Sequence, residues 1–132
     1  MLESVTLVVD IDGTLCPVKQ PNEEYADLLP HKDMITQLRE YRENGARIVL
    51  FTSRNMNSYN GSIGLINANT AKVLLHWLDK WDVPYDEIIY GKPWPGLKGF
   101  YVDDRAVRPD EFLKYSYEEL AAICAKSNEG LK

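Results

Sequence analysis

The hexapeptide 10–15 carries the residues of this chain that are best suited to chemistry. Asp10 and Asp12 stand two positions apart directly after the apolar run 5–9, and Gly13 behind them permits a sharp turn. A carboxylate can attack phosphorus as a nucleophile, and a second acid beside it can protonate the leaving group. Two acids at the end of a buried strand are costly unless something compensates them. The pair therefore favours phosphoryl chemistry over a simple turn or capping role, although aspartates are common in turns.

Three further polar patches follow apolar runs in the same way. Thr52 and Ser53 come after the run 47–51, Lys92 comes after the run 87–90, and the pair Asp103 and Asp104 comes after the run 99–102. Apolar runs of this length that are bounded by polar residues are typical of buried strands. The sequence therefore predicts four strands, each with a chemically useful side chain just beyond its carboxyl end.

Helical patterns lie between these strands. Apolar residues at helical spacing predict a helix over 34–41 that stops at Asn44-Gly45, and a second helix over 68–81. Ser116 and Glu119 fit a capping box that opens a terminal helix. Strands that alternate with helices indicate an α/β protein with a parallel sheet, in which ligands bind beyond the carboxyl ends of the strands. The four patches are therefore expected to form one site.

Length and composition narrow the class of protein. The chain has 132 residues, of which 45% are hydrophobic and 27% charged, and this predicts one globular domain over 1–132. A net charge of -5 argues against a nucleic-acid partner. The sequence shows no basic leader that would indicate a signal peptide, and no apolar run long enough to indicate a membrane span. Cys16 and Cys124 fit two reduced thiols in a cytoplasmic protein, with a disulfide left open.

The hexapeptide resembles the first motif of the haloacid dehalogenase-like hydrolases, a superfamily of mostly magnesium-dependent phosphatases. Thr52, Lys92 in Gly91-Lys92-Pro93, and Asp103-Asp104 follow in that family's order. The stretches 52–56, 64–67, 84–87, 91–94 and 100–105 are also similar to small bacterial proteins associated with capsular polysaccharide biosynthesis. The resemblance extends over roughly residues 5–112, which is most of the chain.

This resemblance implies a role for each acid. Asp10 would attack phosphorus and form an aspartyl-phosphate, and Asp12 would act as general acid and then as general base. Mg²⁺ would bind the Asp10 carboxylate, the Asp12 backbone carbonyl and Asp104, with Asp103 acting through a water molecule. A hard cation that takes carboxylate and phosphate oxygens together would relieve the repulsion between these acids and a phosphate dianion.

The resemblance also implies phosphate and substrate contacts. Thr52 would offer its hydroxyl and Ser53 its backbone N–H to a phosphate oxygen, and Lys92 would neutralise the transferring phosphoryl group. Four further residues are candidates for substrate contacts: Arg54, Asn55, Asn67 and Arg105. For Arg105, structural pairing with a neighbouring acid is an equal alternative.

The fold implied by the resemblance is a Rossmann-like doubly wound sheet, mainly parallel, with strand order 3-2-1-4. Residues 15–51 and 53–91 are largely consumed by a helix and a strand each, so neither gap holds a cap domain. The segment 17–30 is left to serve as a flap, and the loop 54–67 or a second copy of the chain, in a homo-oligomer, is expected to cover the open site.

The leading hypothesis is a Mg²⁺-dependent phosphomonoesterase that acts on a small metabolite such as a sugar phosphate. A capless phosphatase of macromolecules, acting on nucleic-acid 3′-phosphates or phosphoproteins, is the second hypothesis. A non-catalytic receiver-like regulator is the third, because receiver domains also use acids, Thr or Ser, and Lys. Receivers, however, place their acid pair after the first strand, whereas Asp103 and Asp104 lie late in this chain.

Overall fold

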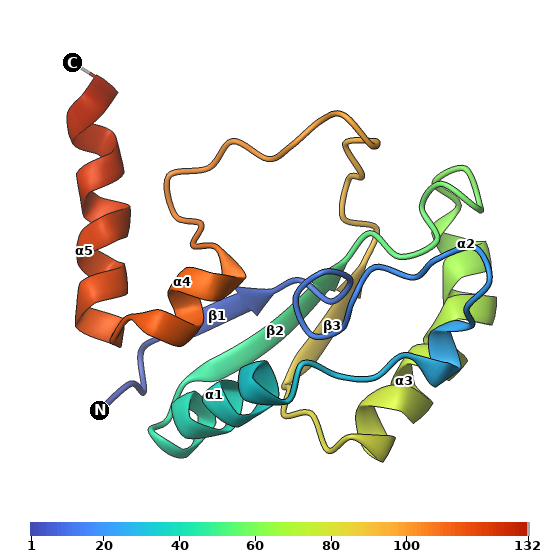
Figure 1. Ribbon diagram of the computed structural model, residues 1–132, viewed down its shortest axis with the longest axis horizontal. Coiled ribbons are helices and arrows are strands. Elements are labelled where there is room, and N and C mark those ends of the chain that lie inside the picture. The colour runs from blue at the N-terminus through green and yellow to red at the C-terminus, as the bar shows by residue number, and fades with distance from the viewer. Residues whose placement is uncertain (132) are drawn as a thin grey trace. The chain divides into compact units, whose positions relative to one another are not determined.

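A three-stranded parallel sheet forms the centre of the fold in the computed structural model, which describes residues 1–131. The strands are β1 (Thr6–Val9), β2 (Arg47–Thr52) and β3 (Glu87–Tyr90). They pair in the order β1-β2-β3, so that β2 lies in the middle (Figure 1). The parallel α/β class predicted from the sequence is therefore confirmed for these three strands.

Helices connect and follow the strands. Between β1 and β2 lie the 3₁₀ turn η1 (Tyr25–Asp27) and α1 (Lys32–Glu43), and α1 ends at Asn44-Gly45 as predicted. Between β2 and β3, helical structure begins at Ile63, earlier than the predicted start at residue 68. It comprises α2 (Ile63–Leu65), a π-helical turn η2 (Ile66–Thr70) and α3 (Ala71–Lys80). Ser62 opens it, since its hydroxyl accepts the Leu65 N–H at 3.3 Å.

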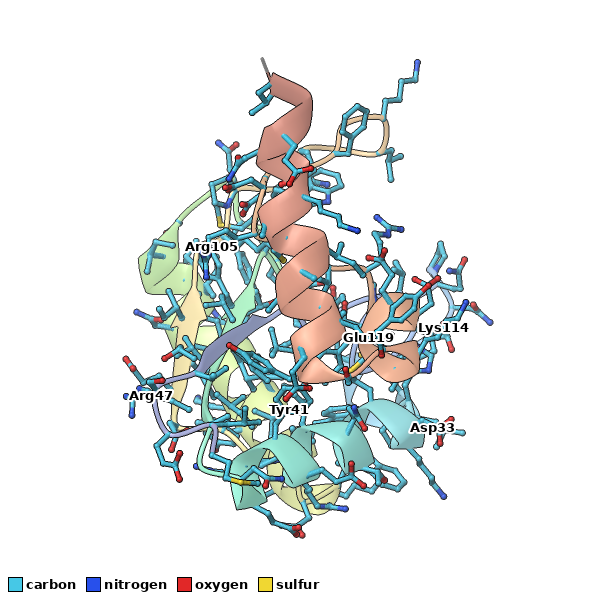
Figure 2. The ribbon with its side chains drawn as sticks, turned by 90° about the vertical axis from the view of Figure 1, so that its left-hand side faces the viewer. Asp33, Tyr41, Arg47, Arg105, Lys114 and Glu119 are labelled. Carbon is cyan, nitrogen blue, oxygen red and sulfur yellow. The ribbon has the colours of Figure 1, made fainter. Side chains whose placement is uncertain are left out.

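The chain separates into two compact units, Met1–Trp94 and Pro95–Lys132. The first contains the sheet. The second contains α4 (Pro109–Lys114), α5 (Tyr117–Ser127) and the 3₁₀ turn η3 (Asn128–Leu131). Ser116 and Glu119 form the predicted capping box of α5, where Figure 2 labels Glu119.

The predicted strand over 99–102 does not form. These residues have no regular secondary structure, and the side chains of Phe100 and Val102 are 80% and 91% exposed. The run is only four residues long and begins at Gly99, whose backbone lies close against that of Pro95. A short run holds strand geometry only when a neighbouring strand pairs with it. The sheet therefore shows the 3-2-1 part of the predicted order 3-2-1-4, without the fourth strand.

Each predicted strand was expected to have buried side chains on both faces of the sheet. Of the three strands that form, only β2 does. Ile48 and Leu50 on β2 are fully buried, whereas Val8 on β1 is 64% exposed and Ile89 on β3 is 47% exposed. The difference follows from position, because β1 and β3 are the edge strands of a small sheet. The fully buried apolar side chains of the core are Ile11, Leu15, Leu38, Ile48, Leu50, Ile66, Leu74, Trp77 and Leu78.

The segment 17–30 is fixed at its C-terminal part. The Trp77 indole Nε1 on α3 donates a hydrogen bond of 2.7 Å to the carbonyl oxygen of Leu28, and both side chains are buried. The His31 N–H donates to the Leu15 carbonyl oxygen at 2.7 Å, which closes the segment behind the hexapeptide. The expected flap is therefore attached to the core.

Two predictions about the cysteines and the membrane can be compared directly with the structure. Cys16 and Cys124 are both free thiols. Within residues 1–131, none of the helices combines the length and the apolar character needed to cross a bilayer.

We expect Trp77→Phe to lower the free energy of unfolding by about 2 kcal/mol, because it leaves the buried Leu28 carbonyl without its donor. Trp81→Phe is the matched control, since the Trp81 indole N–H has no hydrogen-bond partner among the described residues. It should cost less than about 1 kcal/mol. Urea unfolding of both variants measures the difference, and equal losses would show that the bond to Leu28 contributes nothing.

Candidate active site

Asp10 and Lys92 meet at the carboxyl ends of the strands. The Lys92 ammonium nitrogen lies 3.5 Å from Asp10 Oδ1, and the Thr14 hydroxyl donates to Asp10 Oδ2 at 3.3 Å. Lys92 follows β3, and its backbone N–H donates to the Thr52 carbonyl oxygen at 3.1 Å. This bond holds Lys92 over the end of β2, so that its side chain reaches Asp10 from the opposite edge of the sheet.

The environment of Asp10 raises the pKa of its carboxyl group. Burial is the largest cause, and the negative charge of Asp12 adds to it, while the positive charge of Lys92 opposes it. The Asp10 side chain nevertheless remains 32% exposed. It is therefore a partly desolvated carboxylate that solvent and a ligand can reach.

Two glycines make the turns that present these side chains. Gly13 has a φ of +88°, a left-handed conformation that suits glycine, and it directly follows Asp12. The turn closes on Ile11, whose carbonyl oxygen accepts the N–H groups of Thr14 and Leu15. Gly91 has a φ of +86°, and a Cβ atom there would lie 2.5 Å from Ile63 Cδ1. The positive φ therefore favours glycine at this position, one residue before Lys92, and a larger residue would also displace the Ile63 side chain.

Asp12 is paired with Arg54 through two hydrogen bonds. Arg54 Nε donates to Oδ2 at 3.1 Å and Nη2 donates to Oδ1 at 2.9 Å. The Arg54 side chain is 2% exposed and the Asp12 side chain is 23% exposed. Arg54 was expected to contact substrate, but the structure buries it against Asp12. A substrate contact would require it to leave this pair.

Cys16 lies beside the same carboxylate without being a nucleophile. Its Sγ atom is 3.8 Å from Asp12 Oδ1 and 3.9 Å from Arg54 Nη2, and the side chain is fully buried. Burial raises the pKa of the Cys16 thiol to about 12, with the charge of Asp12 adding to the effect and that of Arg54 opposing it. At neutral pH the thiol is protonated and acts as a small packing group.

Thr52 and Ser53 shape the start of the loop after β2. Thr52 is 1% exposed, and its hydroxyl oxygen accepts the Arg54 N–H at 3.0 Å. The Thr52 hydroxyl can still donate a hydrogen bond of its own, because a hydroxyl group is both a donor and an acceptor. Ser53 is half-buried, and its carbonyl oxygen accepts the Met56 N–H at 3.0 Å. The loop is therefore folded back on itself immediately beyond the strand.

The structure gives Asn55 a local structural contact and leaves Asn67 on the surface. Asn55 has a left-handed φ of +62°, and its Oδ1 accepts the Thr70 hydroxyl at 2.7 Å. This bond ties the loop to the π-helical turn η2. Asn67 is exposed on η2. Their expected substrate contacts stay predictions.

Asp103, Asp104 and Arg105 belong to the second unit, and all three are exposed. The Arg105 N–H donates to Asp103 Oδ1 at 2.9 Å, so this acid supports a local turn. The Asp104 carbonyl oxygen accepts the Ser127 hydroxyl at 3.1 Å, whereas its carboxylate is exposed. The structure thus brings together Asp10, Asp12, Thr52, Arg54 and Lys92, while the Asp103-Asp104 pair is placed only within its own unit.

The first unit contains oxygen atoms of the type that bind a hard cation. Within residues 1–131, no group of three His, Cys, Asp or Glu side chains gathers closely enough to hold a metal ion. The first unit supplies the Asp10 carboxylate and the Asp12 backbone carbonyl, and Mg²⁺ prefers such oxygen ligands. The Asp12 carboxylate is occupied by Arg54. The first unit therefore offers two oxygen donors of the kind that Mg²⁺ prefers.

Tyr25 and the partner of Arg54 were missed by the sequence analysis. Tyr25 lies in the predicted flap, and its ring centre is 4.2 Å from Arg54 Cζ. No spacing rule connects these residues, which are 29 positions apart. The available signal was an aromatic residue directly after the polar stretch 19–24, together with an arginine directly after the Thr52-Ser53 patch.

Because folding raises the pKa of Asp10, its ionisation should cost stability. The native state gains from the protonated form below the ordinary pKa of 3.8, and this gain is lost as the pH rises through the folded pKa. Asp10→Asn should therefore raise the free energy of unfolding at neutral pH, and its advantage should shrink as the pH falls toward the ordinary pKa.

Asp86→Asn is the control of opposite sign. The Ile48 N–H and Arg42 lower the pKa of the Asp86 carboxyl group, so this variant should be less stable at neutral pH and approach the wild type in acid. Urea unfolding from about pH 3 to pH 7 with a chelator present measures both variants. A destabilised Asp10→Asn at neutral pH would contradict the site description.

The chain is similar to chains of known structure. Searches of protein-family models and of curated proteins found no match. A chain of a Pnkp1/Rnl/Hen1 complex is 18% identical over 83% of this chain and 33% of its own length, with a TM-score of 0.48. The crystal structure of an MCSG target from Vibrio cholerae is 49% identical over 93% of this chain and 98% of that chain, with a TM-score of 0.88. On this likeness, the chain belongs to the same family as the Vibrio cholerae protein.

Proposed function

We propose that this protein is a Mg²⁺-dependent phosphomonoesterase that works through an aspartyl-phosphate on Asp10. The observation that carries the proposal is the contact between Asp10 and Lys92 at the carboxyl ends of the strands, 3.5 Å apart and partly open to solvent. A carboxylate beside a fixed ammonium group fits nucleophilic attack on a phosphoryl group, because the cation offsets charge on both partners.

The reaction divides between the two aspartates. In the first step an Asp10 oxygen forms a bond to phosphorus, the bond to the leaving oxygen breaks, and Asp12 gives that oxygen a proton. In the second step Asp12 takes a proton from water, whose oxygen bonds to phosphorus while the Asp10–phosphorus bond breaks. Lys92 and the Thr52 hydroxyl would face the phosphoryl oxygens, and the Ser53 N–H would add a further donor.

The metal requirement follows from the charge balance of these side chains. Lys92 contacts Asp10 and Arg54 contacts Asp12, so both cations are already engaged by aspartates when a phosphate dianion approaches. When bound, Mg²⁺ would supply that charge and polarise the phosphoryl group. The Asp10 carboxylate, the Asp12 backbone carbonyl and Asp104 would hold it, with Asp103 acting through water.

The substrate class rests on the resemblance to haloacid dehalogenase-like hydrolases and to capsule-associated proteins. A small phosphorylated metabolite, such as a sugar phosphate, is the proposed substrate. The same resemblance supports a haloacid dehalogenase-like sheet and no cap domain, and a second copy of the chain would help to cover the open site. Two reduced thiols fit a cytoplasmic protein. The net charge of -5 disfavours nucleic acid.

The proposal predicts phosphatase activity that depends on Asp10. Purified protein with Mg²⁺ is assayed against sugar phosphates, nucleotides, 3′-phosphorylated oligonucleotides and phosphopeptides. Asp10→Asn, which keeps the shape but loses the nucleophile, should reduce turnover by more than about 100-fold while circular dichroism stays unchanged. Activity only on phosphopeptides or oligonucleotides would show that the substrate is a macromolecule. An active Asp10→Asn variant would show that Asp10 is not the nucleophile.

The metal ligands are tested by ranking the two late aspartates. Asp104→Ala should raise the Mg²⁺ concentration needed for half-maximal activity more than Asp103→Ala does, because Asp104 is the proposed direct ligand. The Asp104 bond to Ser127 uses a backbone oxygen and survives the substitution. A reversed ranking would show that Asp103 binds the metal directly.

A further inference from the structure

Arg54 is held on both sides of its guanidinium group. One edge of the group pairs with both carboxylate oxygens of Asp12, at 3.1 and 2.9 Å. Its face lies against the Tyr25 ring, 4.2 Å from the ring centre, which is a cation–π contact. A two-bond pair fixes the plane of the carboxylate, and one bond leaves it free to rotate. The orientation of the Asp12 side chain is therefore set by Arg54.

The backbone around Arg54 is fixed as well. Its N–H is bonded to the Thr52 hydroxyl at the end of β2, and the next residue, Asn55, takes a left-handed conformation that the Thr70 hydroxyl supports. These contacts reach from the sheet on one side to η2 on the other. Arg54 therefore stands on a rigid support, as a residue that must orient another side chain requires.

Tyr25 connects this pair to the segment 17–30. It belongs to η1, and the neighbouring Leu28 is buried and bonded to Trp77. Burial raises the pKa of the Tyr25 hydroxyl, and the charge of Asp12 adds to this effect, so the ring lies within the electrostatic reach of the carboxylate. The segment thus places an aromatic ring against Arg54, whose side chain is 2% exposed.

Arg54 is poorly placed to bind substrate itself. Its side chain is 2% exposed, two of its nitrogens are used by Asp12, and the third, Nη1, is buried without a hydrogen-bond partner among residues 1–131. Asp12 Oδ1 also accepts the Cys16 thiol at 3.8 Å, whereas Oδ2 keeps a second lone pair after accepting from Arg54, so a proton can still be carried on Oδ2. The pair leaves Asp12 able to exchange protons while restricting how it points.

We propose that Arg54 is a positioning residue that orients Asp12 for proton transfer, and that Tyr25 supports it from the segment 17–30. This inference rests on the proposed phosphatase function. It differs from a role of Arg54 in phosphate or sugar recognition, because it acts only through Asp12. Loss of Arg54 should therefore damage the same step as loss of Asp12.

Leaving-group dependence tests this inference. A p-nitrophenolate leaving group needs little proton donation, whereas an alkoxide depends on it, and general acid catalysis is typically worth ~10²–10⁴-fold. Asp12→Asn should therefore reduce kcat for an alkyl phosphate far more than for p-nitrophenyl phosphate. Arg54→Met should also reduce kcat more for the alkyl phosphate than for p-nitrophenyl phosphate, by about 10-fold or more. Arg54→Lys and Tyr25→Ala should show a smaller difference between the two substrates. In the Asp12→Asn background, Arg54→Met should cause almost no further loss of kcat.

Arg42→Met is the matched control. Arg42 also pairs with a carboxylate, Asp86 at 2.5 Å, but at the amino-terminal side of β3. It should reduce stability and leave the ratio between the two substrates unchanged. Equal losses of Arg54→Met on both substrates, or a full additional loss in the Asp12→Asn background, would overturn the positioning role. If Arg54→Met does not fold, the Arg54→Lys and Tyr25→Ala ratios decide in the same way.

A second measurement separates this inference from the phosphatase proposal. The Arg54 Nε–H signal in an NMR spectrum, assigned by its loss in Arg54→Lys, should shift strongly in Asp12→Asn and little in Asp10→Asn. If the wild type hydrolyses no phosphate monoester, the proposed function fails and this signal still reports on the pair. If the chemical shift of the Arg54 Nε–H does not change in Asp12→Asn, the orienting contact is absent in solution and the inference is wrong.

Discussion

The site depends on supplying each of two neighbouring carboxylates with its own cation. Asp10 and Asp12 are two residues apart, and the charge of Asp12 helps to raise the pKa of the Asp10 carboxyl group. Two such groups in a partly desolvated place are unfavourable without compensation. Lys92 lies at 3.5 Å from Asp10, and Arg54 forms the buried pair with Asp12. Removing either cation would leave a partly desolvated carboxylate without its paired charge.

This constraint explains much of the surrounding fold. Lys92 and Arg54 follow different strands, so a parallel sheet is needed to bring both cations to the same edge as the aspartates. Gly13 and Gly91 make the turns that aim the side chains, and Trp77 anchors the segment that covers Arg54. The two aspartates receive different cations: Asp10 a lysine and partial exposure, Asp12 an arginine with two bonds. Different environments suit different chemical roles.

Local patterns in the sequence predicted the local structure well. The runs that became β1, β2 and β3, the end of α1 at Asn44-Gly45 and the capping box at Ser116 depend on neighbouring residues, which a sequence shows directly. The run 99–102 did not become a strand, because that outcome requires a pairing partner. The Arg54–Asp12 pair and the Tyr25 contact join residues that are 42 and 29 positions apart, and no periodicity marks such contacts.

The central claim is that the Asp10 carboxylate forms a covalent bond to phosphorus. It is tested most directly by quenching the Mg²⁺-loaded protein in acid during turnover of a phosphate monoester and reducing it with borohydride, which converts an aspartyl-phosphate to homoserine. Peptide mass spectrometry then locates the change. We expect homoserine at position 10 and at no other aspartate. An unmodified Asp10 in a protein that is turning over substrate, or homoserine at Asp12, would contradict the account.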